Sequence, residues 1–131
     1  MAHIPADMKY TKDHEWIKMI DDKTAYVGIT DHAQHAMGDI VYVELPEVDA
    51  EVEAHVDLCV VESVKGANDV FCPVSGKVLE ANEALDDSPE LLNKDAYTNW
   101  IAKIEVADAS ELDSLLTPEA YAKLVEESEA E

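Results

Sequence analysis

The sequence is poor in basic residues, with 9 lysines and arginines against 30 aspartates and glutamates and a formal net charge of −21. A surface of that charge repels the phosphate backbone of nucleic acids and the anionic surface of membranes, so neither is an expected partner. We expect instead partners with basic docking patches, in encounters that weaken as salt rises. Because like charges repel one another, the composition also favours a monomer.

Long apolar runs and targeting segments are also lacking. No stretch of about twenty apolar residues is present, which excludes a membrane-spanning helix on hydropathy. The first seven residues show neither a basic segment followed by an apolar stretch nor an Arg- and Ser-rich amphipathic segment. We therefore expect the sequence as given to remain in the cytoplasm.

Cysteine is scarce, and the two present do not form a CxxC motif. Cys59 and Cys72 lie at equal distances from the Lys65–Gly66 pair, so an unbulged hairpin would place them opposite each other and would allow a disulfide. In a reducing cytoplasm, two small buried apolar side chains are the favoured interpretation.

Metal ligands are not evident in the sequence. His32 and His35 have helical spacing, but no further soft ligand follows at a spacing typical of zinc sites. We expect no metal site from the full set of histidines, which are His3, His14, His32, His35 and His55.

The length of 131 residues suits one domain with a real core. We expect a lead-in over residues 1–9, a β core over 10–106, C-terminal helices over 107–126 and an acidic tail over 127–131. Many short strands separated by turns favour a mainly β fold, a small sandwich or flattened barrel. The expected strands cover residues 15–20, 24–29, 39–45, 77–82 and 100–106.

Short helices are expected between and after these strands. Thr30 should cap a helix over residues 31–37, with Gly38 at its exit. Asn93 should be the C-cap of a single turn near residues 88–92. A capping box from Ser110 and a helix opened by Pro118 predict the two C-terminal helices.

The region of residues 48–56 has no glycine, although turns are expected there. Asp49-Ala50 and Ala54-His55 can form type I turns, but a position that demands a positive φ would be strained.

Residues 60–72 are typical of a β-hairpin. A β-branched run reaches Lys65, meets Gly66 at once, and returns through a second apolar run. A lysine at a hairpin tip is accessible to a second protein, and its amine is a common target of amide-forming modification. An ordinary solvated turn lysine is the alternative interpretation from the hairpin alone.

Several further sequence blocks, in a fixed order, make the interpretation of this hairpin more specific. They are residues 10–16, 27–34, 38–46, 62–69 and 73–76, followed by Asn93, Tyr97 and Trp100. Together they resemble the lipoyl-carrying H protein of the glycine cleavage system, over about residues 8 to 125. That family also usually has glycines in the turns of residues 48–56.

The resemblance implies a quasi-twofold barrel-sandwich hybrid, the flattened barrel of lipoyl and biotinyl domains. It implies lipoic acid joined as an amide to Lys65, attached by a lipoate ligase or lipoyl transferase. Glycine decarboxylase, with pyridoxal phosphate, would load an aminomethyl group on this arm. A tetrahydrofolate-dependent aminomethyltransferase would remove it, and dihydrolipoamide dehydrogenase would reoxidise the arm. The chain itself would be a carrier and not an enzyme.

Five other residues are candidates for the site. Glu62, Gly66 and Asp69 flank the lysine and would take part in recognition of the hairpin, although for the two carboxylates solvated turn charges are an equal alternative. By resemblance, Glu15 would be the carboxylate of a cleft that shelters the loaded arm, with His32 nearby. Some relatives carry the histidine one place later than His35, where this chain has Ala36.

Other interpretations fit the sequence less well. Lipoyl domains of 2-oxoacid dehydrogenases usually have Asp-Lys-Ala at the lysine and continue through a linker, whereas Val64 precedes Lys65 here. Biotin carriers typically place methionines on both sides of the lysine. A Schiff-base enzyme would need a buried lysine, and no partnered nucleophile set is evident.

Overall fold

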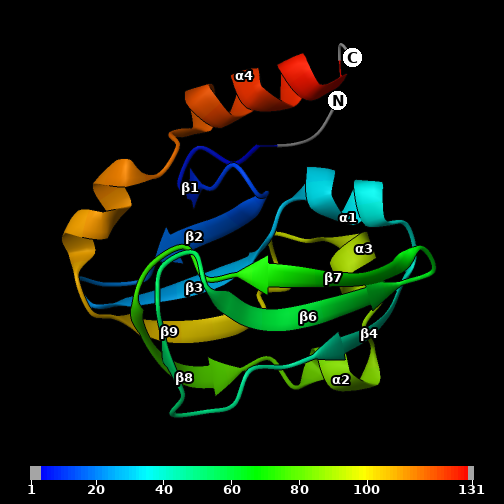
Figure 1. Cartoon of the computed structure of the whole chain (residues 1–131), viewed down its shortest axis with the longest axis horizontal. Helices are drawn as coiled ribbons and strands as arrows, with labels where there is room; N and C mark the ends of the chain where they lie inside the picture. The colour runs from blue at the N-terminus through cyan, green and yellow to red at the C-terminus, as the bar shows by residue number, and fades with distance from the viewer. Residues whose placement is uncertain (1–3, 130–131) are drawn as a thin grey trace.

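Two antiparallel sheets form the core of the computed structural model, which describes residues 4–129 (Figure 1). The larger sheet has the strand order β1-β2-β3-β9-β8-β5 and the smaller has the order β4-β6-β7. The mainly β fold expected from the sequence is confirmed. The strands of the larger sheet are β1 (Lys9–Tyr10), β2 (Glu15–Met19), β3 (Thr24–Ile29), β5 (Glu51–Val52), β8 (Gly76–Ala81) and β9 (Ala102–Val106); those of the smaller are β4 (Ile40–Glu44), β6 (Asp57–Ser63) and β7 (Gly66–Phe71).

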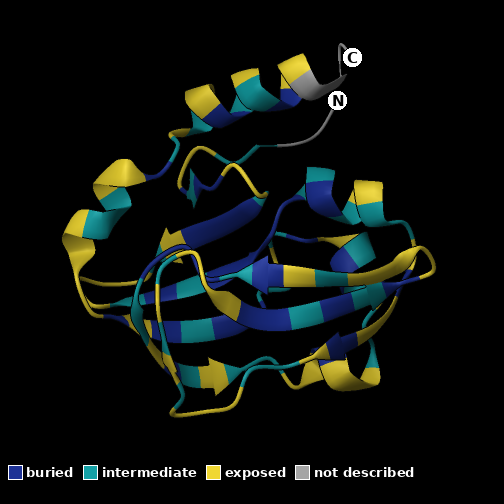
Figure 2. Ribbon diagram, in the orientation of Figure 1, coloured by how far each residue is buried: buried dark blue, intermediate teal, exposed yellow. Residues whose placement is uncertain are grey.

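The main core lies between the sheets and is built from buried residues of both (Figure 2). Because side chains of a strand alternate between its two faces, the period-two pattern of β9 buries Ala102, Ile104 and Val106 together. A smaller cluster packs the C-terminal helix against the start of the larger sheet. It contains Met8, Tyr10, Trp16, Tyr121 and Val125.

Short helices fill the connections between strands. Helix α1 (Asp31–Met37) begins as expected, with the Thr30 side chain accepting a hydrogen bond from the Ala33 amide. The other helices are α2 (Ala84–Asp87), α3 (Leu91–Lys94), the 3₁₀ helix η1 (Ala109–Ser114) and α4 (Pro118–Glu129). None of the described helices is long and apolar enough to cross a bilayer.

Three helix ends differ from the sequence predictions. Asn93 lies inside α3 and is not a C-cap. The cap of η1 is Asp108, whose carboxylate accepts from the Ser110 amide, because an aspartate two residues earlier fills the role expected of Ser110. Helix α4 continues to Glu129, so the expected tail from residue 127 is largely helical, and residues 130–131 lie outside the described part. Residues 1–3 of the expected lead-in, including His3, also lie outside it.

The register of the β6–β7 hairpin corrects the pairing expected for the cysteines. Ser63 pairs with Gly66 and Cys59 pairs with Val70, because the turn is centred on Val64-Lys65 and not on Lys65-Gly66. Cys59 and Cys72 are therefore not opposite each other; both are free and buried. Burial raises the pKa of Cys59 to about 12 and that of Cys72 to about 11, which keeps both thiols protonated at neutral pH.

Candidate functional site

Lys65 lies at the tip of the β6–β7 hairpin, in a two-residue loop with Val64. Both residues are exposed, Val64 by 67%. The Ser63 hydroxyl accepts a hydrogen bond from the Lys65 amide at 3.2 Å and donates to the Gly66 carbonyl at 3.3 Å. The predicted exposed tip is confirmed, although the turn is centred on Val64-Lys65 and not on Lys65-Gly66.

Gly66 is required for its backbone and not for close packing. Its φ is +138°, which L side chains rarely adopt, while a Cβ there would meet nothing within 4 Å. The chain can therefore leave the loop sharply and enter β7 at once.

The side chain of Lys65 lies against the C-terminal end of α1. Its Nζ donates a hydrogen bond to the Ala36 carbonyl at 3.2 Å. Carbonyls in the last turn of a helix lack partners within the helix and carry partial negative charge, so a cation is favoured there.

A groove of about 340 Å³ lies between α1, the 13–14 loop and the hairpin. Its lining includes the apolar Ala33 and Met37, whereas Asp13, Ser63 and Asn68 add polar groups. Lys65 itself lines the groove. An acyl chain attached to this amine would therefore start at the groove and would find both apolar and polar surface there.

His14 lines the same groove in an uncommon backbone conformation, with a φ of 70°. Its Nδ1 lies 2.8 Å from the Tyr121 hydroxyl, and its ring lies 4.4 Å from the ring of His32. Burial, and then the neighbouring His32, lower the pKa of His14 below its ordinary value. The lowered pKa favours the uncharged form of His14 at neutral pH. In the sequence, His14 was a candidate only for metal binding, and its place directly before Glu15 was the available signal for the groove.

The side chain of Glu15 is only 3% exposed. Glu15 is not among the described residues that line the groove. The Thr11 hydroxyl donates to Oε1 at 2.6 Å and the Phe71 amide donates to Oε2 at 3.3 Å. Burial raises the pKa of Glu15 to about 7, and these two hydrogen bonds oppose the shift. Glu15 therefore joins β2 to the far end of the lysine hairpin.

Three candidates, His32, Glu62 and Asp69, are not among the residues that line the groove. His32 is half-buried and contacts His14, and so stands behind the groove lining. Glu62 pairs with Tyr42 and Ala67, while Asp69 pairs with Val60. Because Val61 and Ser63 are buried, alternation places Glu62 on the outer face of the small sheet.

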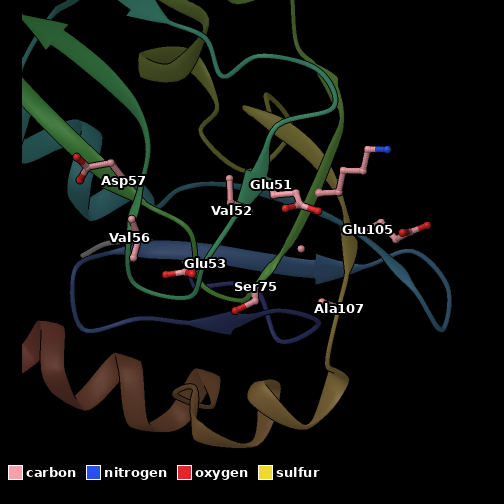
Figure 3. A pocket seen from close by; sticks show the side chains of 10 residues that line it. Glu51, Val52, Glu53, Val56, Asp57, Ser75, Glu105 and Ala107 are labelled. Atoms are coloured by element: carbon pink, nitrogen blue, oxygen red, sulfur yellow. The ribbon is translucent and has the colours of Figure 1, made fainter.

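A larger hollow of about 590 Å³ lies at the other end of β6 from Lys65 (Figure 3). Glu51, Glu53, Asp57 and Glu105 make its lining acidic. Since Asp57 begins β6 and Ser63 ends it, the length of the strand, roughly 20 Å, separates this hollow from the hairpin tip. It is not part of the site around Lys65.

Metal chemistry finds no support in the described residues. Within residues 4–129, no three His, Cys, Asp or Glu side chains are grouped so that they could hold a metal ion. His32 and His35 both lie on α1, but only His32 contacts another histidine ring.

Comparison with known proteins gives one consistent family. Residues 8–128 match the family model described as Glycine cleavage H-protein. The glycine cleavage system H protein of Alkaliphilus oremlandii (strain OhILAs) is 57% identical over 121 residues, which cover 92% of this chain and 94% of the relative. That of Escherichia coli O7:K1 (strain IAI39 / ExPEC) is 52% identical over 128 residues, which cover 97% and 99%.

A solved structure agrees with these relatives. The crystal structure of a glycine cleavage system H protein from Mycobacterium marinum matches with a TM-score of 0.84 at 39% identity, and the match covers 92% of this chain and 97% of that chain. The similarity found by sequence includes both sheets, the hairpin that bears Lys65 and nearly all of α4.

Proposed function

Because the chain belongs to the glycine cleavage H-protein family, we propose that it carries lipoic acid as an amide on Nζ of Lys65 and so delivers an aminomethyl group between enzymes. The observation that carries the assignment to Lys65 is its exposure at a two-residue hairpin tip beside a groove. An amine held there can enter the active site of an attaching enzyme without unfolding of the carrier. Members of this family are not themselves catalysts, and the chain acts as a carrier.

When bound, lipoic acid supplies a disulfide that accepts the aminomethyl group and two electrons. The chain contributes a rigid anchor, since β6 pairs with β4 on one side and β7 on the other. Tethering raises the local concentration of the cargo at each active site that the arm reaches.

The proposed partners act in sequence. A lipoate ligase or lipoyl transferase acylates Lys65, and glycine decarboxylase loads the arm. The tetrahydrofolate-dependent aminomethyltransferase unloads it, and dihydrolipoamide dehydrogenase restores the disulfide. The net charge of −21 supports docking through basic patches on these enzymes by a monomeric carrier.

The flanking residues have separate proposed roles. Glu62, Gly66 and Asp69 present the hairpin to the attaching enzyme, Gly66 through its backbone and the carboxylates through charge. The groove shelters the arm, with His14 in contact and His32 behind it. Glu15 supports the shelter by holding Thr11 and Phe71, since its enclosed carboxylate does not line the groove.

Glycine-dependent exchange of bicarbonate with purified glycine decarboxylase tests the proposal. We expect exchange with the lipoylated chain and none with the unmodified chain at the same concentration. Reductive acylation by a 2-oxoacid decarboxylase in place of this exchange would instead identify a lipoyl domain of another complex.

A further inference from the structure

Asn93 connects three segments, although it lies outside the groove. Its Oδ1 accepts from the Ile40 amide at 2.9 Å, and its Nδ2 donates to Gln34 Oε1 and to the Gly38 carbonyl, each at 2.9 Å. The Ile40 amide can only donate, so the oxygen of Asn93 must face it and the orientation of the amide is fixed. Both donors are then used, and α3 is tied to the chain on either side of Gly38.

Residues 36–39, here called the α1–β4 corner, contact the hairpin tip at separate points. The Ala36 carbonyl accepts from Lys65 Nζ at 3.2 Å, and the Asp39 carbonyl accepts from the Val64 amide at 3.0 Å. Between them, a Cβ at Gly38 would lie 3.6 Å from Val64 and 3.7 Å from Lys65 Cε. The lysine stem therefore passes directly over a residue that has no side chain.

The corner contains a backbone conformation that few residues adopt. Gly38 has φ +78° and ψ −155°, a region that is open to glycine and costly for other residues. Glycine is also the residue with the most freedom to leave such a conformation. Asn93 makes hydrogen bonds to the backbone of Gly38 and Ile40, and these bonds restrict the backbone motion of Gly38.

From this geometry we infer that Asn93 is a positioning residue for the modification site: it fixes the α1–β4 corner on which the unmodified Lys65 side chain rests. The inference rests on the proposed function only in taking Lys65 as the lysine that becomes modified. The effect of Asn93 on the Lys65 amine does not depend on that function. Acylation requires the amine to leave the Ala36 carbonyl, so a looser corner exposes the amine more often. After acylation Nζ keeps one N–H, which can return to the same carbonyl and directs the root of the arm toward the groove.

Competitive acetylation of the unmodified protein tests the inference without any partner enzyme. A trace amount of an acetyl N-hydroxysuccinimide ester labels each lysine, and peptide mapping gives the rate at Lys65 relative to Lys77 and Lys103 in the same molecule. We expect Asn93→Ala to raise the relative rate at Lys65 about 2- to 10-fold, the range that corresponds to the loss of one ordinary hydrogen bond.

Asn99→Ala is the matched control. Asn99 Nδ2 also makes two hydrogen bonds, to the Leu91 and Asp95 carbonyls at 2.9 and 3.0 Å, but neither reaches the corner. We expect this variant to leave the Lys65 rate unchanged even where it lowers stability. Asn93→Asp, which keeps the acceptor for the Ile40 amide and loses both donors, provides a second variant should the alanine variant not fold, and we expect it to raise the rate as well.

An unchanged Lys65 rate in a folded Asn93 variant would overturn the inference, as would an equal rise in Asn99→Ala. Either result leaves the proposed function standing. Conversely, failure of glycine-dependent exchange would remove the proposed function without altering the labelling result.

Discussion

Nδ1 of His14 lies 2.8 Å from the hydroxyl oxygen of Tyr121, so the C-terminal helix directly contacts a residue of the groove. The same hydroxyl lies 2.7 Å from Oγ1 of Thr30, the cap of α1. The Tyr121 ring is fully buried and stacks on Tyr10 with centroids 4.6 Å apart. Helix α4 thus holds both walls of the groove, the 13–14 loop and the start of α1.

This relationship predicts the effect of Tyr121→Phe. The ring and its stacking remain, but His14 and Thr30 each lose a buried partner, so we expect a loss of roughly 1 to 3 kcal/mol in the free energy of unfolding. Urea denaturation measures it. Tyr42→Phe is the control, because the Tyr42 side chain is 44% exposed and its change should lie within about 0.5 kcal/mol. Equal stability of the two variants would contradict the role of Tyr121.

The buried carboxyl of Glu15 predicts a pH dependence. Its pKa is raised from 4.5 to about 7, so the folded protein retains a proton that the unfolded chain releases. This contribution to stability is fully present below about pH 4.5 and is lost as the pH rises through about 7. Glu15→Gln cannot titrate, and we expect the stability of the wild type relative to this variant to fall by roughly 3 kcal/mol at most between about pH 4.5 and 8.

Denaturant unfolding of both proteins across that pH range measures the difference. Glu44→Gln removes an exposed carboxylate and controls for the change in net charge. If the free energy of unfolding of the wild type instead rose with pH relative to that of Glu15→Gln, the result would contradict a carboxyl whose pKa is raised by burial.

The backbone of His55 predicts a stabilising substitution. His55 has a φ of 65°, while its amide donates to the Cys72 carbonyl at 2.7 Å. Glycine keeps that hydrogen bond and removes the strain of the left-handed conformation, so we expect His55→Gly to stabilise by about 0.5 to 1 kcal/mol. Thermal unfolding provides the measurement.

Ala54→Gly is the matched control in the same turn, because Ala54 does not have a positive φ. It should destabilise by about 0.5 to 1 kcal/mol through the greater freedom of the unfolded chain. The account of this turn would be wrong if both glycine variants changed stability in the same direction.

The sequence predicted the features that depend on local patterns. The strands near β2, β3, β4, β8 and β9 follow from alternation, and the Thr30 cap and Pro118 start follow from side chains that act within one turn. The absence of glycine in residues 48–56 correctly indicated strain, which the structure places at Asp49 and His55. The hairpin was predicted from its β-branched arms, but its register was not, because Gly66 suggested a turn at Lys65-Gly66, whereas Gly66 begins β7 and the turn is Val64-Lys65.

The candidate site was predictable where it depends on the hairpin tip and not where it depends on distant contacts. The Asn93 amide reaches residues 53 to 59 positions away, so only the fold shows that it bonds to distant segments and is not a cap. Glu15 was expected to be the carboxylate of the arm cleft, and that role stays a prediction; the fold adds that its side chain is buried and accepts hydrogen bonds from Thr11 and Phe71. Such outcomes follow from how the two sheets pack, and a linear pattern does not encode them.

The central claim is that lipoic acid is attached covalently to the side-chain amine of Lys65. Intact-mass analysis of the protein made in lipoate-fed cells, followed by peptide mapping, tests it most directly. We predict a single lipoyl adduct on Lys65 that is absent from folded Lys65→Ala and retained in Lys77→Ala; Lys77 is also exposed but lies within β8. A lipoyl adduct on another lysine, a biotinyl adduct, or no adduct in the presence of an active lipoate ligase would contradict the account.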